Sequence, residues 1–174
     1  MDINLSHGDA PKLRGLSKSM TAEGWRHEPS LLFYADGTDP DLRYFGGFHA
    51  MDPYLAFAVG QTKVAVASIH ELDKMLSESD FDEILPLPEL QQEAIRRFKL
   101  KQGTRPHESD LIRLIAERFR IRSFRVGNRF PAGLLVALQQ AGIAVEVDRQ
   151  PALFAQRQIK RAWEVEAIRK GNRA

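Results

Sequence analysis

The chain has 174 residues, of which 43% are hydrophobic and 28% are charged, a composition typical of one folded globular domain. Its 25 Lys and Arg nearly balance its 23 Asp and Glu, so the overall charge gives no signal for nucleic acid or for an anionic membrane. The absence of cysteine excludes disulfides, thiol catalysis and thiolate metal sites, and no apolar run approaches the roughly 20 residues that span a bilayer.

The first 28 residues are polar, with several glycines and little periodicity. We expect residues 1–28 to form a variable segment with one short helix between Leu13 and Met20. This segment lacks the apolar stretch of a signal peptide, which favours a cytoplasmic location.

From residue 29 onward, strand-like and helix-like segments alternate. Short apolar runs predict strands at 31–35, 54–59, 63–69, 83–87, 123–127 and 143–147. Apolar residues at helical spacing predict helices at 71–79, 89–100, 108–120, 131–141 and 156–170. One more short helix is expected after a cap at Thr38 or Asp39, with Pro40 in its first turn and Gly46-Gly47 at its end.

The connection between the second and third predicted strands determines their pairing. Only Gly60-Gln61-Thr62 separates them, and so short a link permits an antiparallel hairpin alone. Both strands are almost continuously apolar, which implies cover on both faces. Together with the later alternation of helices and strands, this predicts a mixed α/β sheet with helices on both sides.

The predicted helices each carry an apolar stripe. In the helix at 71–79 the stripe consists of Leu72, Met75 and Leu76; at 108–120, of Leu111, Ile112, Leu114, Ile115 and Phe119; and at 131–141, of Leu134, Leu135 and Leu138.

The last predicted helix, 156–170, is unusual because its apolar residues do not share one face. At 100° per residue, Ile159 and Trp163 lie on one side, whereas Val165 and Ile168 lie on roughly the opposite side. We interpret this segment as a helix that packs against its own domain on one face and against a second domain on the other. The alternative is a frayed terminal helix with scattered exposed apolar residues.

A local basic run, Arg118 to Arg125, contains interleaved aromatic residues, a pattern that can bind nucleic acid. The same pattern fits a helix end followed by a strand with one solvated face, and we favour that interpretation.

Motifs of self-contained catalysis are missing. The five histidines form no helical pair, and the sequence contains no nucleotide-binding glycine loop and no nucleophile elbow. The closest group of potential ligands, His70 with Glu71 and Asp73, is assigned to helix capping, and His49 with Asp52 to a surface loop. We therefore predict no catalytic and no metal-binding residue in this chain.

Three segments resemble the amino-terminal domain of the creatinase and Xaa-Pro peptidase family, which includes prolidase and aminopeptidase P. They are Asp41-Leu42-Arg43-Tyr44-Phe45-Gly46-Gly47-Phe48, the hairpin from Asp52 to Ser68 with Glu71, and Pro151 to Lys160 with the helix that follows. Asp41 stands where the family usually has Asn. The resemblance implies a three-layer α/β/α fold of the ribonuclease-H-like type over residues 29–155, followed by a linker helix, 156–174, towards a carboxy-terminal catalytic domain.

In that family, the catalytic domain binds two divalent metal ions, manganese or similar, and hydrolyses proline-containing peptides. The resemblance further implies a homodimer in which the amino-terminal domain borders the active site of the neighbouring subunit. Arg43, Tyr44, Phe48 and His49 match that region and are the substrate-access candidates, although for Tyr44 and Phe48 we favour the alternative that they are core residues. Ile159, Trp163, Val165 and Ile168 are the interdomain candidates.

Three functions follow from the sequence. The first is a non-catalytic accessory domain of a metal-dependent Xaa-Pro dipeptidase-like enzyme, which predicts that this chain alone is inactive. The second is a stand-alone module that binds a ligand or protein and lacks the peptidase half. The third, weak nucleic-acid binding through Arg118 to Arg125, requires an affinity that falls steeply with salt.

Overall fold

A six-stranded mixed sheet forms the centre of the protein in a computed structural model that describes residues 28–101, 103–160 and 162–172. The strand order is β4-β3-β2-β1-β5-β6. Strand β2 is antiparallel to both of its neighbours, and the remaining pairs are parallel. The strands are β1 (Ser30–Ala35), β2 (Tyr54–Val59), β3 (Thr62–Ala67), β4 (Glu83–Pro86), β5 (Ser123–Val126) and β6 (Ala144–Val147). The helix expected between Leu13 and Met20 lies outside the described residues.

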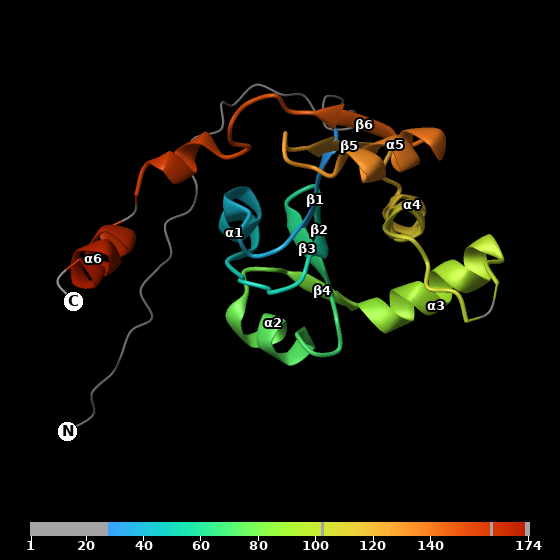
Figure 1. Cartoon of the computed structure of the whole chain (residues 1–174), viewed down its shortest axis with the longest axis horizontal. Helices are drawn as coiled ribbons and strands as arrows, with labels where there is room; N and C mark the ends of the chain where they lie inside the picture. The colour runs from blue at the N-terminus through green and yellow to red at the C-terminus, as the bar shows by residue number, and fades with distance from the viewer. Residues whose placement is uncertain (1–27, 102, 161, 173–174) are drawn as a thin grey trace.

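Helices cover both faces of this sheet, as Figure 1 shows. Helices α1 (Pro40–Gly46) and α2 (Leu72–Glu78) pack on one face. Helices α3 (Leu87–Phe98), α4 (Glu108–Phe119) and α5 (Ala132–Gln140) pack on the other. The predicted three-layer α/β/α architecture with a mixed sheet is therefore confirmed.

Consecutive residues of the central strands enter the two different cores. Leu32 of β1 packs beneath α3, α4 and α5, whereas its neighbour Phe33 packs beneath α1 and α2. Leu55 and Ala56 of β2 divide in the same way. Because side chains alternate along a strand, a strand buried on both faces must be apolar at every position, which explains the uninterrupted apolar runs.

Helix α1 begins and ends as its sequence predicts. The Asp39 carboxylate accepts hydrogen bonds from the backbone N–H groups of Asp41 at 2.9 Å and Leu42 at 2.8 Å. At the other end, Gly47 has a φ of 65°, a left-handed conformation that glycine adopts without steric cost. These caps fix the direction of α1, which carries several of the candidate site residues.

Several predicted boundaries and faces are wrong. Strand β3 ends at Ala67 rather than at Ile69, which is 71% exposed. Leu76 is 62% exposed, because α2 presents only one narrow face to the sheet and Met75 occupies it. Helix α3 starts at Leu87, immediately after β4, so Leu87 belongs to this helix and not to the strand predicted at 83–87. Pro131 caps α5 instead of starting it.

The continuous helix predicted at 156–170 is also wrong. The structure has a 3-10 helix at Ala155–Gln158, a break with extended backbone at Ile159, and then α6 at Ala162–Gly171. Since Ile159 lies at the break, its direction cannot be derived from the helical periodicity of α6. Ile159 is 78% and Ile168 50% exposed, Val165 is half-buried, and the side chain of Trp163 is outside the description. Figure 1 shows α6 set apart from the three layers.

Candidate functional site

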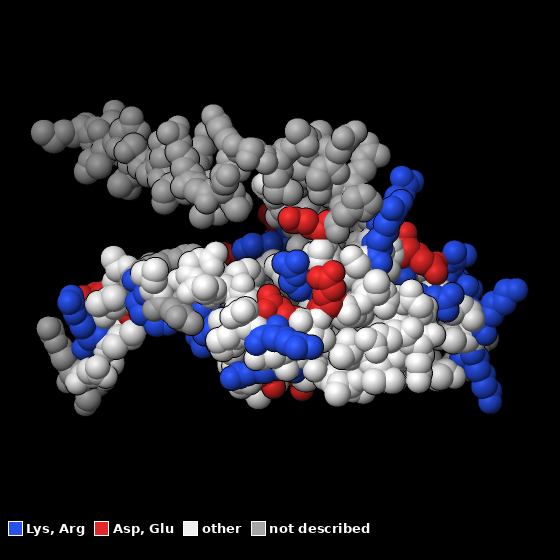
Figure 2. Space-filling model, turned by 90° about the horizontal axis from the view of Figure 1, so that it is seen from above, with Lys and Arg blue, Asp and Glu red and all other residues white. Residues whose placement is uncertain are grey.

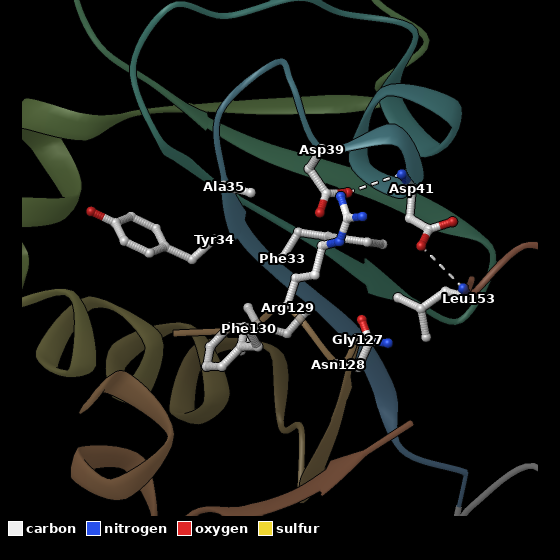
Figure 3. A pocket seen from close by; sticks show the side chains of 11 residues that line it. Phe33, Tyr34, Ala35, Asp39, Asp41, Gly127, Asn128, Arg129, Phe130 and Leu153 are labelled. Atoms are coloured by element: carbon white, nitrogen blue, oxygen red, sulfur yellow. Dashed lines mark hydrogen bonds between the residues drawn. The ribbon is translucent and has the colours of Figure 1, made fainter. Parts of the chain in front are cut away.

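Helix α1 and the chain segment that follows β6 are joined through one carboxylate. We call residues 151–157 the strap. Asp41, in the first turn of α1, accepts hydrogen bonds from the backbone N–H of Leu153 at 3.1 Å and from Arg157 Nε at 2.7 Å (Figure 3 draws the first). The backbone N–H of Phe154 lies 3.5 Å from the same carboxylate. The Asp41 and Arg157 side chains are only 14% and 24% exposed, so this ion pair is largely protected from solvent.

An aromatic cluster holds the same strap from a second direction. The Phe154 ring lies 5.2 Å from Tyr44, 6.2 Å from Phe45 and 6.4 Å from Phe33, measured between ring centroids. Such offset aromatic pairs contribute about 0.5–1.5 kcal/mol each beyond the burial of their area. The strap is thus attached to α1 by the ion pair between Asp41 and Arg157 and by the ring of Phe154.

The two contacts unite segments that are distant in the sequence. Asp41 to Phe48 and Pro151 to Lys160 carried two of the three resemblances identified above, and the structure places residues from both in direct contact. Asp41 was noted only as a departure from Asn. Its pairing with Arg157 was missed, because nothing in the local sequence pattern connects positions 116 residues apart.

A small pocket lies beside this junction, between the carboxyl ends of β1 and β5. These parallel strands are neighbours, and the helices that follow them, α1 and α5, pack on opposite faces, an arrangement that often creates a ligand crevice. Here the pocket volume is about 30 Å³, roughly the space of one water molecule. Figure 3 shows Arg129 pointing across it towards Asp39. The pocket is too small for an organic ligand.

The four substrate-access candidates do not form one cluster of exposed side chains. Arg43 is exposed on α1, and Tyr44 is half-buried against Phe154. His49 is exposed, with its Nδ1 3.0 Å from the carbonyl oxygen of Gly37. Phe48 is only 2% exposed and belongs to the core beneath α1 and α2, as the alternative interpretation expected.

The remaining titratable residues that the sequence suggested show no ligand geometry. Within the described residues, no group of three or more His, Asp or Glu side chains is arranged to hold a metal ion. Glu71 is the N-cap of α2 and Asp73 lies in its first turn, which confirms the predicted position of this group at a helix start, although Glu71 makes no side-chain capping hydrogen bond. None of the helices in the described part of the chain has the length and apolarity of a membrane span.

The basic run forms a helix end and a half-solvated strand, as predicted. Arg118 lies in the last turn of α4 and pairs with Glu93 at 3.6 Å, and the exposed Arg125 on β5 lies 3.8 Å from Glu146. The intervening Phe124 is fully buried. On the face shown in Figure 2, basic and acidic side chains are interspersed.

No known protein-family profile matches the chain, and none of the curated proteins compared with it has a similar sequence. Solved structures are similar. An X-Pro aminopeptidase from Thermotoga maritima matches with a TM-score of 0.60 and 15% identity, over 82% of this chain and 36% of that one. A prolidase from Pyrococcus horikoshii matches with a TM-score of 0.56 and 16% identity, over 82% and 34% of the two chains.

A third structure, a Xaa-Pro dipeptidase from Bacillus anthracis, matches with a TM-score of 0.55 and 10% identity, over 79% of this chain and 33% of that one. The chain thus spans about a third of the length of these proteins. The resemblance identified from the sequence is confirmed at the level of fold: this chain has the fold of one part of the Xaa-Pro peptidase structures.

Proposed function

We propose that the chain is the non-catalytic amino-terminal domain of a larger Xaa-Pro dipeptidase-like metallopeptidase. The fold shared with part of three Xaa-Pro peptidases supports this assignment. The observation that carries it is the strap. Asp41 and the aromatic cluster fix the chain firmly up to Arg157, and beyond that point Ile159 and Ile168 expose apolar side chains. A linker that is anchored at its root and apolar at its far end is what a docking second domain requires.

In this proposal, the second domain supplies the chemistry. It binds two divalent metal ions, manganese or similar, that activate water for hydrolysis of proline-containing peptides. Ile159, Trp163, Val165 and Ile168 contact that domain. Arg43, Tyr44 and His49 border the substrate entrance, and the buried Phe48 acts indirectly by holding the loop that carries His49. The whole protein is a cytoplasmic homodimer.

Activity measurements test the proposal. Hydrolysis of a Xaa-Pro dipeptide in the presence of Mn²⁺ is measured for the 174-residue chain and for the product of the complete reading frame. We expect turnover only from the second protein. Turnover by the 174-residue chain itself would overturn the proposal.

A docking variant tests the interdomain role separately. In the complete protein, Ile168→Asp places a charge in the expected interface and should reduce activity together with thermal stability. Arg169→Gln, on the neighbouring exposed position, is the matched control and should change neither. Equal behaviour of the two variants contradicts a docked α6.

A stand-alone binding module remains the second candidate, because the molecule has a larger cavity at the carboxyl edge of its sheet. The coding sequence after Ala174 separates the two functions: a stop codon supports the module, and continued coding supports the accessory domain.

A further inference from the structure

A second cavity, of about 360 Å³, opens at the carboxyl edge of the sheet on the side of α3 and α4. It lies between the ends of β1 and β3, the start of β2, and the first turns of α3 and α4. Organic ligands occupy pockets of roughly 300–1,000 Å³, so this cavity suits a small one. The carboxyl edge is also where open α/β sheets commonly bind their ligands.

The floor of the cavity is apolar. Leu55, Val66 and Leu111 line it and are each only 3% exposed overall, and Leu87 adds a half-buried side chain. A ligand that fills this cavity therefore places an aliphatic or similarly apolar group against the sheet.

The rim is polar and charged. Asp52, Glu71 and Glu108 contribute three carboxylates, and Arg105 contributes one guanidinium. Within the described residues, the side chains of Asp52, Glu71 and Arg105 make no hydrogen bond and no ion pair with protein groups. The cavity therefore has both negative and positive side chains that do not pair with each other, and its three carboxylates outnumber its one guanidinium.

Tyr34 and Glu108 lie next to each other at the cavity. Tyr34 borders both the small pocket beside Asp41 and the larger cavity, and Figure 3 shows its ring pointing away from the small pocket. Burial raises the pKa of the Tyr34 hydroxyl, and the negative charge of the neighbouring Glu108 carboxylate raises it further. The hydroxyl is therefore protonated at neutral pH and lies beside Glu108 at the cavity.

We propose that this cavity binds a small zwitterion of the aliphatic amino-acid class. The ligand's ammonium group lies against Glu71 and Glu108, its carboxylate pairs with Arg105, and its apolar side chain packs on Leu55, Val66 and Leu111. A simple anion is disfavoured by the excess of carboxylates, and a bare metal ion by the lack of a metal-binding group among the described residues. This inference does not rest on the proposed peptidase role.

Isothermal titration calorimetry on the full 174-residue chain tests the assignment with three probes that share one carbon skeleton. L-leucine carries both charges, 3-methylbutylamine carries only the ammonium group, and 3-methylbutanoate carries only the carboxylate. We expect saturable binding of leucine, weaker binding of the amine and the weakest binding of the acid. No saturable binding of leucine, or an amine or acid that binds as tightly as leucine, overturns the proposal.

Variants then locate the binding site. Glu108→Gln and Glu71→Gln should each weaken leucine binding about fivefold or more, the effect of removing one nearby charge in a partly solvated site. Arg105→Gln should remove the advantage of leucine over the amine. Glu78→Gln, an exposed carboxylate on α2 outside the cavity, is the matched control and should leave leucine binding unchanged.

Glu108 is the first residue of α4, so Glu108→Gln could reduce leucine binding by disturbing that helix. Glu71 lies outside α4, and Glu71→Gln therefore tests the binding site independently. Leucine binding that no rim variant weakens contradicts the site. Because binding is measured on this chain alone, its failure is distinguishable from failure of the peptidase assignment.

Discussion

Asp41 and Arg157 are 116 positions apart in the chain, yet the Nε atom of Arg157 lies 2.7 Å from Oδ1 of Asp41. The same carboxylate accepts a hydrogen bond from the backbone of Leu153. A single side chain at the start of α1 therefore contacts the strap at Leu153 and at Arg157, shortly before α6 begins.

Replacing Asp41 with Ala should release the strap. Loss of charge-assisted hydrogen bonds that are mostly shielded from water should cost about 2 kcal/mol of unfolding free energy. Chemical denaturation measures this loss, and hydrogen exchange should show faster exchange of the Leu153 amide. Asp80→Asn, at an exposed carboxylate beside Gly47, is the control and should leave both measurements near the wild-type values. An unchanged Leu153 exchange rate in Asp41→Ala would refute the role given to Asp41.

Phe154→Ala should weaken the strap through the aromatic cluster. Its ring is half-buried, so we expect a cost of about 2 kcal/mol, below that of a fully buried phenylalanine. Since Asp41 and Phe154 hold one segment, the double variant should lose less stability than the sum of the single variants. Strict additivity in a double-mutant cycle would indicate two independent attachments.

Gly37→Ala tests the close approach of two loops near His49. An added Cβ would come within 2.7 Å of the Ala50 carbonyl oxygen and 2.8 Å of its nitrogen, and it would also meet His49. Backbone atoms cannot move aside easily, so we expect a loss of about 2 kcal/mol in thermal or chemical unfolding. Gly133→Ala, in α5 with open space around its Cα, should instead gain about 0.5–1 kcal/mol. A neutral Gly37→Ala variant would contradict this packing.

Tyr54→Phe should stabilise the protein. Tyr54 is 5% exposed, and its hydroxyl has no hydrogen-bond partner among the described residues, so removing it should gain about 1 kcal/mol at neutral pH. Denaturation at pH 7 measures the gain. A loss of stability would show that the hydroxyl has a partner.

The same variant should reduce the dependence of the unfolding free energy on pH in the alkaline range. Burial raises the pKa of Tyr54 in the folded state, with a smaller contribution from Glu71, whereas in the unfolded state the pKa is about 10. The unfolding free energy of the wild type is therefore unaffected by this titration below that pH and declines as the pH rises further. Unfolding free energies measured from about pH 9 to 11 should fall more steeply for the wild type than for Tyr54→Phe.

Much of the architecture was predictable because its signals are local. The Asp39 cap, Pro40 and Gly47 define α1 within nine residues, and the short link at Gly60 permits only a hairpin. Uninterrupted apolar runs in β2 and β3 indicated burial on both faces, which the alternation of Leu55 and Ala56 between the two cores explains.

The candidate sites were less predictable, since each combines residues from distant segments. The cavity rim takes Tyr34 from β1, Glu71 from the start of α2 and Arg105 from the loop before α4. Each residue alone is an ordinary polar position, and only the order of the strands brings the three together. The sequence could likewise not decide between core and surface for Tyr44 and Phe48, because both choices fit the same short helix and turn.

The amino-acid sequence by itself determined where most helices and strands form and that both faces of the sheet are covered, because caps, turns and periodicity act over a few residues. Tertiary structure alone decided the course of the carboxy-terminal segment. Helical periodicity predicted one helix from 156 to 170, but Asp41 and the aromatic cluster hold residues 153–157 against α1, and the backbone is extended at Ile159 before α6 begins. Contacts between residues more than a hundred positions apart therefore override a local helical preference that contributes only a small free energy.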